Sequence, residues 1–452
     1  MIYSDLEKNV LKKTTPSLEY RKKVDNATKE ISKKIKNEIK KRKLPVTVKL
    51  AGSIAKDTYL KDNMDIDFFL CFPANFSKKL IAENALSIGK NLLKNTEESY
   101  AEHPYIRGYY DNFYVEIVPC YKIENARQKL SAVDRTPLHT KFVIKNIKPE
   151  LKQDVRLFKQ FLKGINCYGA EAQIEGFSGY LCEILIIKYR GFQTLIQNAS
   201  KWKYGKKIAI KKGNYQNFDT PLIFIDPVDF NRNVASALSK DKYNLFIKAC
   251  KQYLKNPKIT FFFPNKIKPW NILKIKQKTI DQKCKYVGIK IPRPDIIDEN
   301  LFPQIRKASK SVYDSCKRYD FKVYDVNFYV NEKTIYIILK IDKKPLSKTM
   351  IHTGPPVKKQ QNSQEFQNKW HNSNKVVKKP YVKDNRWFVE IKREYIDIKD
   401  FLSNEFKSLS LGKHLDKIAK KKYEILKTDD LIKEKLRVYW TEYFDGKMSW
   451  ER

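Results

Sequence analysis

The chain has 452 residues, of which 42% are hydrophobic and 13% aromatic, so its composition excludes a generally disordered protein. Its 91 Lys and Arg residues against 51 Asp and Glu residues give a formal net charge of +40, spread along the chain. This excess attracts polyanions and makes nucleic acid the expected partner. A membrane is not expected, because no apolar stretch reaches the ~18 residues of a membrane span and no basic amphipathic helix carries Trp and Leu on one face.

The cysteines and the first residues bear on the compartment. The seven cysteines are scattered without a CxxC pair, and the N-terminus lacks the apolar segment of a signal peptide. We therefore expect neither disulfides nor a structural zinc site, and we expect a cytoplasmic protein. At roughly 150 residues per domain, the length predicts about three domains.

The first predicted domain covers residues 1–145 and combines helices with strands. Thr15 and Pro16 predict the start of a helix whose apolar residues recur at helical spacing up to Ile39, and Pro45 ends it. Strands are expected at residues 46–50, 65–72 and 113–121, and a helix at residues 78–93.

Two further regions follow. Residues 146–258 are predicted to be mainly helical, with helices at residues 151–162, 178–197 and 233–254. Over residues 259–452, the strand-like segments ITFFFP, FKVYDVNFYVN, TIYIILKID and RWFVEIKRE alternate with helices such as residues 415–426. The GPP of HTGPPV predicts a rigid turn before a polar run. The expected fold class is a multidomain α+β protein.

Three acidic residues and a Gly-Ser pair fall at the ends or within the predicted strands of the first domain. Gly52 and Ser53 follow the first strand, Asp65 and Asp67 open the second, and Glu116 lies within the third. Residues i and i+2 of a strand face the same side, so Asp65 and Asp67 point together. If the strand of Glu116 is adjacent, three carboxylates converge.

Converging carboxylates repel one another unless a divalent cation neutralises them, and Mg²⁺ prefers such oxygen ligands and brings substrate phosphates with it. Two Mg²⁺ ions about 4 Å apart can activate an attacking hydroxyl and stabilise a leaving pyrophosphate. Gly52 and Ser53 can hold a triphosphate, and Lys56 adds a positive charge beside them. A DxD pair or a Gly-Ser pair alone is commonly a turn, but the combination predicts a metal-dependent nucleotidyltransferase.

Longer blocks of the sequence point to one family. They are AGSIAKDTYLKDNMDIDFFLCFP, AEHPYIRG, VEIVPCYKI, SAVDRTPLHT, LFKQFLKGINCYGAE, GFSGYLCEILIIKYRGF and DPVDFNRNVASALS, within residues 51–239. In this order they resemble the archaeal-type (class I) CCA-adding enzymes, which HTGPPV and Trp370 resemble more loosely. The resemblance implies a polymerase-β-like nucleotidyltransferase head, a helical neck, and a mixed α+β body and tail. It also implies addition of C, C and A to tRNA 3′ ends from CTP and ATP without a template, and binding of the acceptor and T arms of tRNA. A homodimer is compatible with it.

The resemblance also assigns residues by their position in these blocks. It implies that Asp65, Asp67 and Glu116 bind the metal ions, and that Ser53 and Lys56 of the head contact the triphosphate together with Lys159 and Tyr168 of the neck. It implies that Thr136, His139 and Arg232 line the sugar and base of the nucleotide, and that His103 lies in a block near the active site. Two positions differ from the common pattern: Lys56 replaces an Arg, so a point charge replaces a bidentate group, and Glu116 stands where Asp is frequent.

Other interpretations of these residues remain open. Without the resemblance, His139 is equally well a core histidine, and Asp226 and Asp229 are expected to cap a helix before Asn233, with Arg232 paired to them. A related enzyme that extends RNA 3′ ends, such as a poly(A) polymerase or an oligoadenylate synthase relative, is the enzymatic alternative. A non-catalytic RNA-binding protein is the alternative from another class.

Overall fold

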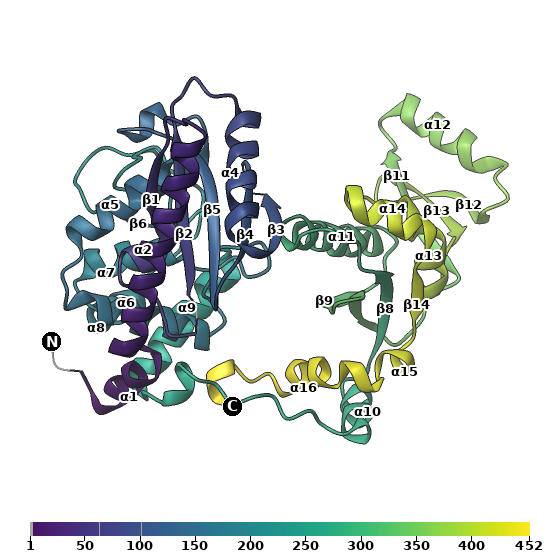
Figure 1. The fold of residues 1–452 in the computed structure, drawn as a ribbon. Helices are drawn as coiled ribbons and strands as arrows, with labels where there is room; N and C mark the ends of the chain where they lie inside the picture. Colours follow the sequence, from purple (N-terminus) through teal and green to yellow (C-terminus); the bar gives the residue numbers. More distant parts are fainter. Residues whose placement is uncertain (1–2, 63, 101) are drawn as a thin grey trace. The chain divides into compact units, whose positions relative to one another are not determined.

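The computed structural model describes residues 3–62, 64–100 and 102–452. The chain divides into two compact units: unit 1 contains the residues up to Lys266 together with Lys447–Arg452, and unit 2 contains Ile267–Gly446 (Figure 1). Both units mix helices with sheets, which confirms the predicted α+β class. The finer division at residues 145/146 and 258/259 stays a prediction.

A five-stranded sheet forms the N-terminal part of unit 1. Its strands lie in the order β1-β2-β5-β4-β3; β2 and β5 run parallel, and the remaining pairs of this sheet are antiparallel. The bounds are β1 Thr47–Leu50, β2 Asp65–Phe72, β3 Lys94–Tyr100, β4 Pro104–Tyr110 and β5 Phe113–Tyr121. Parallel strands need a crossover connection. Helix α4 (Lys78–Leu92) lies in the connection between β2 and β5, directly after β2 in the sequence.

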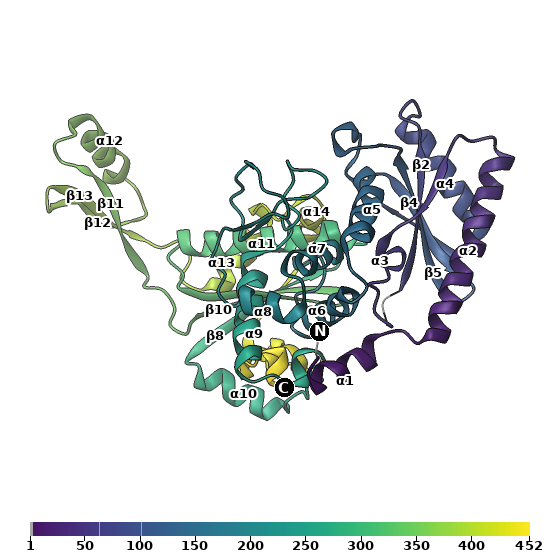
Figure 2. The same ribbon diagram turned by 90° about the vertical axis from the view of Figure 1, so that its left-hand side faces the viewer.

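The two faces of this sheet bury different side chains. Ile66 and Phe68 of β2 and Ile117 of β5 pack in one core with apolar residues of α2 (Leu18–Lys41) and α4, and both helices lie along the same side of the sheet (Figure 2). The alternate residues of the two strands face the other way. Together with Ala51 they form a smaller apolar cluster that contains Phe69, Cys71, Val118 and Cys120.

Most of the predictions for this sheet are confirmed. The strands at residues 65–72 and 113–121 have the predicted bounds, and α4 covers nearly the predicted range. The predicted start of α2 is wrong: Ser17 is its N-cap and accepts from the N–H of Tyr20, whereas Thr15 is the C-cap of the preceding helix α1 (Asp5–Thr14). The prediction also misses β3 and β4. The polar segment of β3 lies at the exposed edge of the sheet, where burial imposes no apolar alternation.

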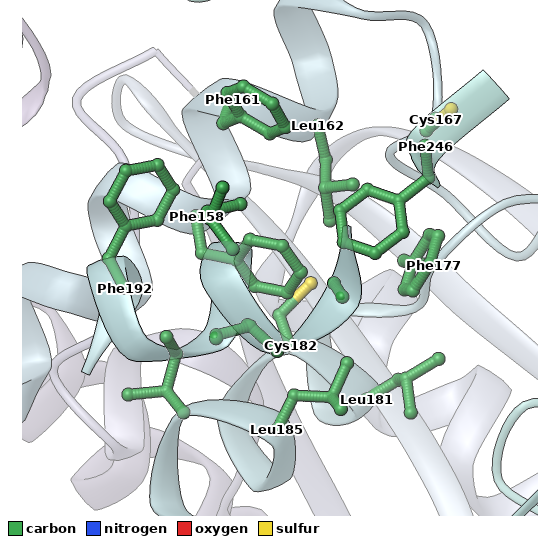
Figure 3. Packing of buried hydrophobic residues seen from close by; sticks show 14 of the residues in the cluster. Phe158, Phe161, Leu162, Cys167, Phe177, Leu181, Cys182, Leu185, Phe192 and Phe246 are labelled. Atoms are coloured by element: carbon green, nitrogen blue, oxygen red, sulfur yellow. The ribbon is translucent and has the colours of Figure 1, made fainter. Parts of the chain in front are cut away.

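Helices built on one large core complete unit 1. They are α5 Thr136–Asn146, α6 Leu151–Gly164, α7 Gly179–Tyr189, α8 Phe192–Ala199 and α9 Lys240–Lys255, with a short strand pair β6 Lys206–Ile208 and β7 Leu222–Phe224. In Figure 3, Phe158 of α6 lies near Cys182 of α7, and Phe177 and Phe246 lie beside them. The rings of Phe158 and Phe246 are 5.9 Å apart in an edge-to-face arrangement. This packing holds α6 and α7 in a fixed relation.

Three predictions for these helices need correction. The helix predicted at residues 178–197 is two helices, because Arg190 adopts a left-handed conformation (φ 59°) and Gly191 has φ 145°. The helix predicted at residues 233–254 is α9, which begins at Lys240 because Ser239 provides its N-cap. The segment ITFFFP is not a strand, because Ile259–Phe261 form a short 3₁₀ helix and Phe261 is buried in the core.

Unit 2 contains two antiparallel sheets. One has the order β14-β8-β10-β9, and the other has the order β11-β13-β12 with α12 lying over it (Figure 1). The strands are β8 Cys284–Pro292, β9 Val323–Val330, β10 Thr334–Asp342, β11 Thr349–Pro356, β12 Val376–Lys383, β13 Arg386–Lys392 and β14 Glu424–Leu426. The helices are α10 Ile272–Asp281, α11 Asp298–Arg318, α12 Gln360–His371, α13 Ile398–Glu405, α14 Lys413–Lys421, α15 Thr428–Leu431 and α16 Arg437–Asp445.

The strands expected in unit 2 from FKVYDVNFYVN, TIYIILKID and RWFVEIKRE are confirmed as β9, β10 and β13. The helix predicted at residues 415–426 is too long, because α14 ends at Lys421 and Glu424–Leu426 instead pairs with β8. The GPP segment expected as a turn continues β11. No helix in the described part of the chain combines the length and the apolar character needed to cross a membrane.

Candidate active site

Three carboxylates gather on the second face of the five-stranded sheet. Strands β2 and β5 pair in parallel with Asp67 directly opposite Glu116, and neighbouring strands lie about 4.8 Å apart. Asp65 is two residues before Asp67, so its side chain lies on the same face. The expectation that the strand of Glu116 adjoins that of Asp65 and Asp67 is therefore confirmed.

Burial and mutual repulsion make these carboxylates hard to ionise. Burial, followed by the negative charges of Glu116 and Asp65, raises the pKa of Asp67 to about 7. Burial also raises the pKa values of Asp65 and Glu116, and Arg107 opposes both shifts. Arg107 lies on β4 directly opposite Glu116, and it was not predicted as a site residue because the prediction misses that strand. The face is therefore suited to bind positive charge.

The Gly-Ser turn lies against these acids. Gly52 has a positive φ of 67°, and a Cβ atom built on it would lie 1.7 Å from Oδ2 of Asp67. The N–H of Ala51 donates to the carbonyl oxygen of Asp67 over 2.9 Å, which fixes the turn to β2. Ser53 follows in the short helix α3 (Gly52–Ala55) and is half-buried. Only a residue without a side chain fits at position 52.

Lys56 and Lys159 meet at a buried carboxylate that the sequence analysis did not identify. Nζ of Lys56 lies 2.6 Å from Oε2 of Glu183, and Nζ of Lys159 lies 3.4 Å from Oε1. Thr58 donates its hydroxyl to Oε1 of Glu183 over 2.6 Å. A signal was present, since Glu183 interrupts the apolar helix YLCEILIIKY and a buried acid requires partners. The hydroxyl of Tyr168 is close to Gly179, one helical turn from Glu183.

His139 and Arg232 meet at a second buried acid, Asp226. Oδ2 of Asp226 lies 2.8 Å from Nε2 of His139 and accepts from Arg232 over 3.0 Å. Tyr180 donates to Oδ1 over 3.2 Å, and its ring stacks on His139 at 4.0 Å. Burial lowers the pKa of His139 although Asp226 opposes the shift. The four side chains form one network on α5, α7 and the loop after β7.

This network corrects the expectation for the two aspartates. Asp226 binds His139 and Arg232, and Asp229 accepts from Lys129 over 2.6 Å and from Arg135 over 3.0 Å. Neither aspartate therefore caps a helix that begins near Asn233, as was expected, because α9 begins only at Lys240. The expected pairing of Arg232 is confirmed for Asp226.

The two remaining predicted residues are Thr136 and His103. Thr136 begins α5, and its carbonyl oxygen accepts from the hydroxyl of Thr140 over 3.0 Å. His103 is buried edge-on against Tyr121, the last residue of β5, at 6.1 Å. Burial, and then the charge of Lys78, lowers its pKa. Within the part of the chain that the structure describes, the ring contact of His103 is with Tyr121 and not with the carboxylates of β2 and β5.

The donor chemistry of the three acids fits a hard divalent cation, because carboxylate oxygens are the ligands such ions prefer. In residues 3–62, 64–100 and 102–452, no three His, Cys, Asp or Glu side chains already stand as a closed metal-binding cluster. The strand register brings the three acids to one face of the sheet.

Comparisons with known proteins cover almost the whole chain. Family profiles match in order: a nucleotidyltransferase domain over residues 32–139, a tRNA nucleotidyltransferase second domain over residues 153–263, and a CCA-adding enzyme C-terminal domain over residues 283–428. The CCA-adding enzyme of Methanosarcina mazei is 34% identical over 438 residues, which is 96% of each chain. That of Methanocaldococcus jannaschii is 36% identical over 91% of this chain and 93% of its own length. The chain therefore belongs to the CCA-adding enzyme family and carries the nucleotidyltransferase fold.

Proposed function

We propose that this protein adds C, C and A to the 3′ ends of tRNA, using CTP and ATP and releasing pyrophosphate, without a nucleic-acid template. The single observation that carries the proposal is the extent of the similarity, which spans 96% of both chains and includes the C-terminal domain. A similarity confined to the nucleotidyltransferase domain would fit many enzymes that extend RNA. The carboxylates on β2 and β5 supply the chemistry that such an enzyme needs.

We propose that Asp65, Asp67 and Glu116 hold two Mg²⁺ ions. When bound, these ions would favour ionisation of the tRNA 3′ hydroxyl and offset negative charge on the α-phosphate and pyrophosphate. The residues themselves provide the position: the paired strands set the spacing of the acids, and Gly52 lets the backbone lie against Asp67. The raised pKa of Asp67 supports this role, because a cation relieves the repulsion that causes the shift.

The nucleotide is proposed to lie between the acids and the two buried ion-pair networks. Ser53, Lys56, Lys159 and Tyr168 are assigned to the triphosphate, and Thr136, His139 and Arg232 to the sugar and base. Clustering supports both assignments, since Lys56 and Lys159 share Glu183 whereas His139 and Arg232 share Asp226. His103 is proposed only to shape the fold near Tyr121, because its ring packs edge-on against that residue.

The remaining expectations concern tRNA and the cell. Residues 1–145 are proposed as the head, 146–258 as the neck, and 259–452 as the body and tail that bind the acceptor and T arms. The net charge of +40 favours such a polyanion. The seven cysteines are free thiols, which suits action in the cytoplasm. A homodimer stays a prediction, which sedimentation equilibrium of the purified chain can decide.

The test uses purified protein, Mg²⁺, labelled CTP and ATP, and a tRNA transcript that lacks its CCA end, resolved on a sequencing gel. Two C additions followed by one A and a stop support the proposal. An open-ended ladder of A would indicate a polyadenylating enzyme on the same fold. Unchanged tRNA that still binds the protein would indicate a non-catalytic RNA-binding protein and would contradict the metal assignment.

A further inference from the structure

We propose that Glu183 is a positioning residue that holds Lys56 and Lys159 where the triphosphate of the incoming nucleotide binds. The inference rests on the proposed function and adds a residue to which no role has been assigned. Glu183 does not touch substrate in this proposal. It acts through the two lysines, by fixing the positions of their ammonium groups.

The contacts of Glu183 divide its two oxygens between the lysines. Oε2 accepts from Lys56 over 2.6 Å, and Oε1 accepts from Thr58 over 2.6 Å and from Lys159 over 3.4 Å. Lys159 also donates to the carbonyl oxygen and the hydroxyl of Thr58, over 3.1 and 3.2 Å. The three N–H groups of Lys159 are thus all directed at the protein, so in this proposal Lys159 adds positive charge beside the triphosphate rather than a further hydrogen bond. Lys56 has Glu183 as its one hydrogen-bond partner among the described residues, so two of its N–H groups remain for phosphate oxygens.

Burial makes the carboxylate necessary. The side chains of Glu183, Lys159 and Lys56 are 0%, 2% and 8% exposed. Two buried ammonium groups beside the same carboxylate repel each other. Burial lowers the pKa of Lys159, and the charge of Glu183 opposes this shift. Burial also opposes ionisation of Glu183, but the charges of Lys56 and Lys159 outweigh it and hold the pKa of Glu183 below its usual range. Each charge in the cluster is stable only because the others are present.

The cluster also joins two parts of unit 1. Lys56 and Thr58 follow the Gly-Ser turn, whereas Lys159 lies on α6 and Glu183 on α7. The neighbours Phe158 and Cys182 belong to the core that fixes these two helices, as Figure 3 shows. Glu183 therefore ties Lys56, which lies beside the carboxylate face, to the rigidly packed helix α7. The negative charge of Glu183 lowers the net positive charge at a phosphate site. Its contribution is instead to fix the geometry of the remaining hydrogen-bond donors.

The same segment offers a matched control, the Asp57–Arg156 pair. Arg156 donates to Oδ1 of Asp57 over 2.5 Å and to its carbonyl oxygen over 2.8 Å, and it also lies on α6. This pair fastens the segment after α3 to the same helix without touching Glu183 or Lys159. Asp57→Asn is therefore expected to loosen the junction without removing any hydrogen bond of the lysine cluster.

The experiment measures binding of inorganic tripolyphosphate by calorimetry to wild type, Glu183→Gln, Glu183→Asp and Asp57→Asn, with thermal unfolding of each. Tripolyphosphate presents the phosphates without the base. KM and kcat for CTP and ATP are measured in parallel. We expect Glu183→Gln to weaken tripolyphosphate binding at least about tenfold, because an unpaired buried ammonium is costly and is lost by deprotonation or displacement. KM should rise by a similar factor, with kcat within about threefold, because the β- and γ-phosphates are bound alike before and during the reaction.

The controls separate positioning from mere stability. Asp57→Asn should lower the unfolding temperature but keep wild-type tripolyphosphate affinity, and Glu183→Asp should restore part of the affinity that Glu183→Gln loses. Equal or tighter binding by Glu183→Gln would overturn the proposal, because Glu183 would then act only by repelling phosphate. An equal loss in Asp57→Asn, or a wild-type chain that binds no tripolyphosphate, would also overturn it. If the wild type binds tripolyphosphate in the expected pattern but adds no CCA, the proposed function fails and the role of Glu183 stands.

Discussion

Asp67→Asn should stabilise the metal-free protein while abolishing nucleotide addition. The pKa of Asp67 is raised from 3.8 to about 7, first by burial and then by Glu116 and Asp65. A carboxyl group with a raised pKa binds its proton more tightly in the folded state than in the unfolded state. The protein therefore loses stability as the pH rises from about 4, where the unfolded group ionises, to about 7.

The size of the effect follows from the shift. About three pH units correspond to about 4 kcal/mol, since each unit corresponds to about 1.4 kcal/mol. The side chain of Asp67 is only half-buried, and solvent screens the repulsion, so we expect about 2 kcal/mol above pH 7. An asparagine carries no charge and removes this cost. For a unit of this size, the unfolding temperature should rise by several degrees, roughly 4–8 °C.

The assay is differential scanning calorimetry of wild type and Asp67→Asn at several pH values, with a chelator. The difference in unfolding temperature between Asp67→Asn and wild type should be small near pH 4, increase up to about pH 7, and then stay constant. Excess Mg²⁺ should narrow it, because the cation stabilises the wild-type site and not the variant. A variant that is less stable than wild type at pH 8 without metal would refute the reasoning, as would a difference that does not change with pH.

Three further outcomes test other parts of the site. Gly52→Ala should lower the rate of CTP incorporation about 100-fold in single turnovers, because its Cβ would displace the Asp67 carboxylate 1.7 Å away; a wild-type rate would contradict that close approach. Asp226→Asn should reduce the choice of ATP over CTP on a tRNA ending in CC about tenfold, since His139 and Arg232 lose their shared partner; an unchanged ratio of kcat/KM values would show that Asp226 does not orient them. Affinity for tRNA, measured by filter binding, should fall at least about 100-fold between 50 and 200 mM salt, and a flat response would exclude phosphate contacts as the main source of affinity.

Much of the catalytic face could be predicted because it depends on local periodicity. Apolar residues define β2 and β5 because they are the ones that become buried. The bounds of both strands can therefore be predicted from the sequence, as can the position of Asp65 and Asp67 on one face. The ordered blocks between residues 51 and 239 likewise identify the family, which the full-length similarity then confirms.

Contacts between distant parts of the chain had to come from the tertiary structure. Glu183 lies 127 residues from Lys56 in the sequence, and nothing in its helix says which cation would neutralise it. The same is true of Asp226, which local pattern assigned to a helix cap and which the fold brings to His139. The start of α2 was predicted wrongly because Thr15 and Ser17 are both of a residue type favoured at N-caps, and the sequence does not show that Thr15 is the C-cap of α1.

The sequence by itself determined the apolar periodicity, the positions of the three acidic residues on their strands, and the family. The tertiary structure alone decided the parallel register that sets Asp67 beside Glu116, and the ion-pair networks around Glu183 and Asp226. The physical reason is that alternation reflects each residue's own transfer from water, which is a local property. Strand register and buried charge pairs depend on which distant segments the common core brings together.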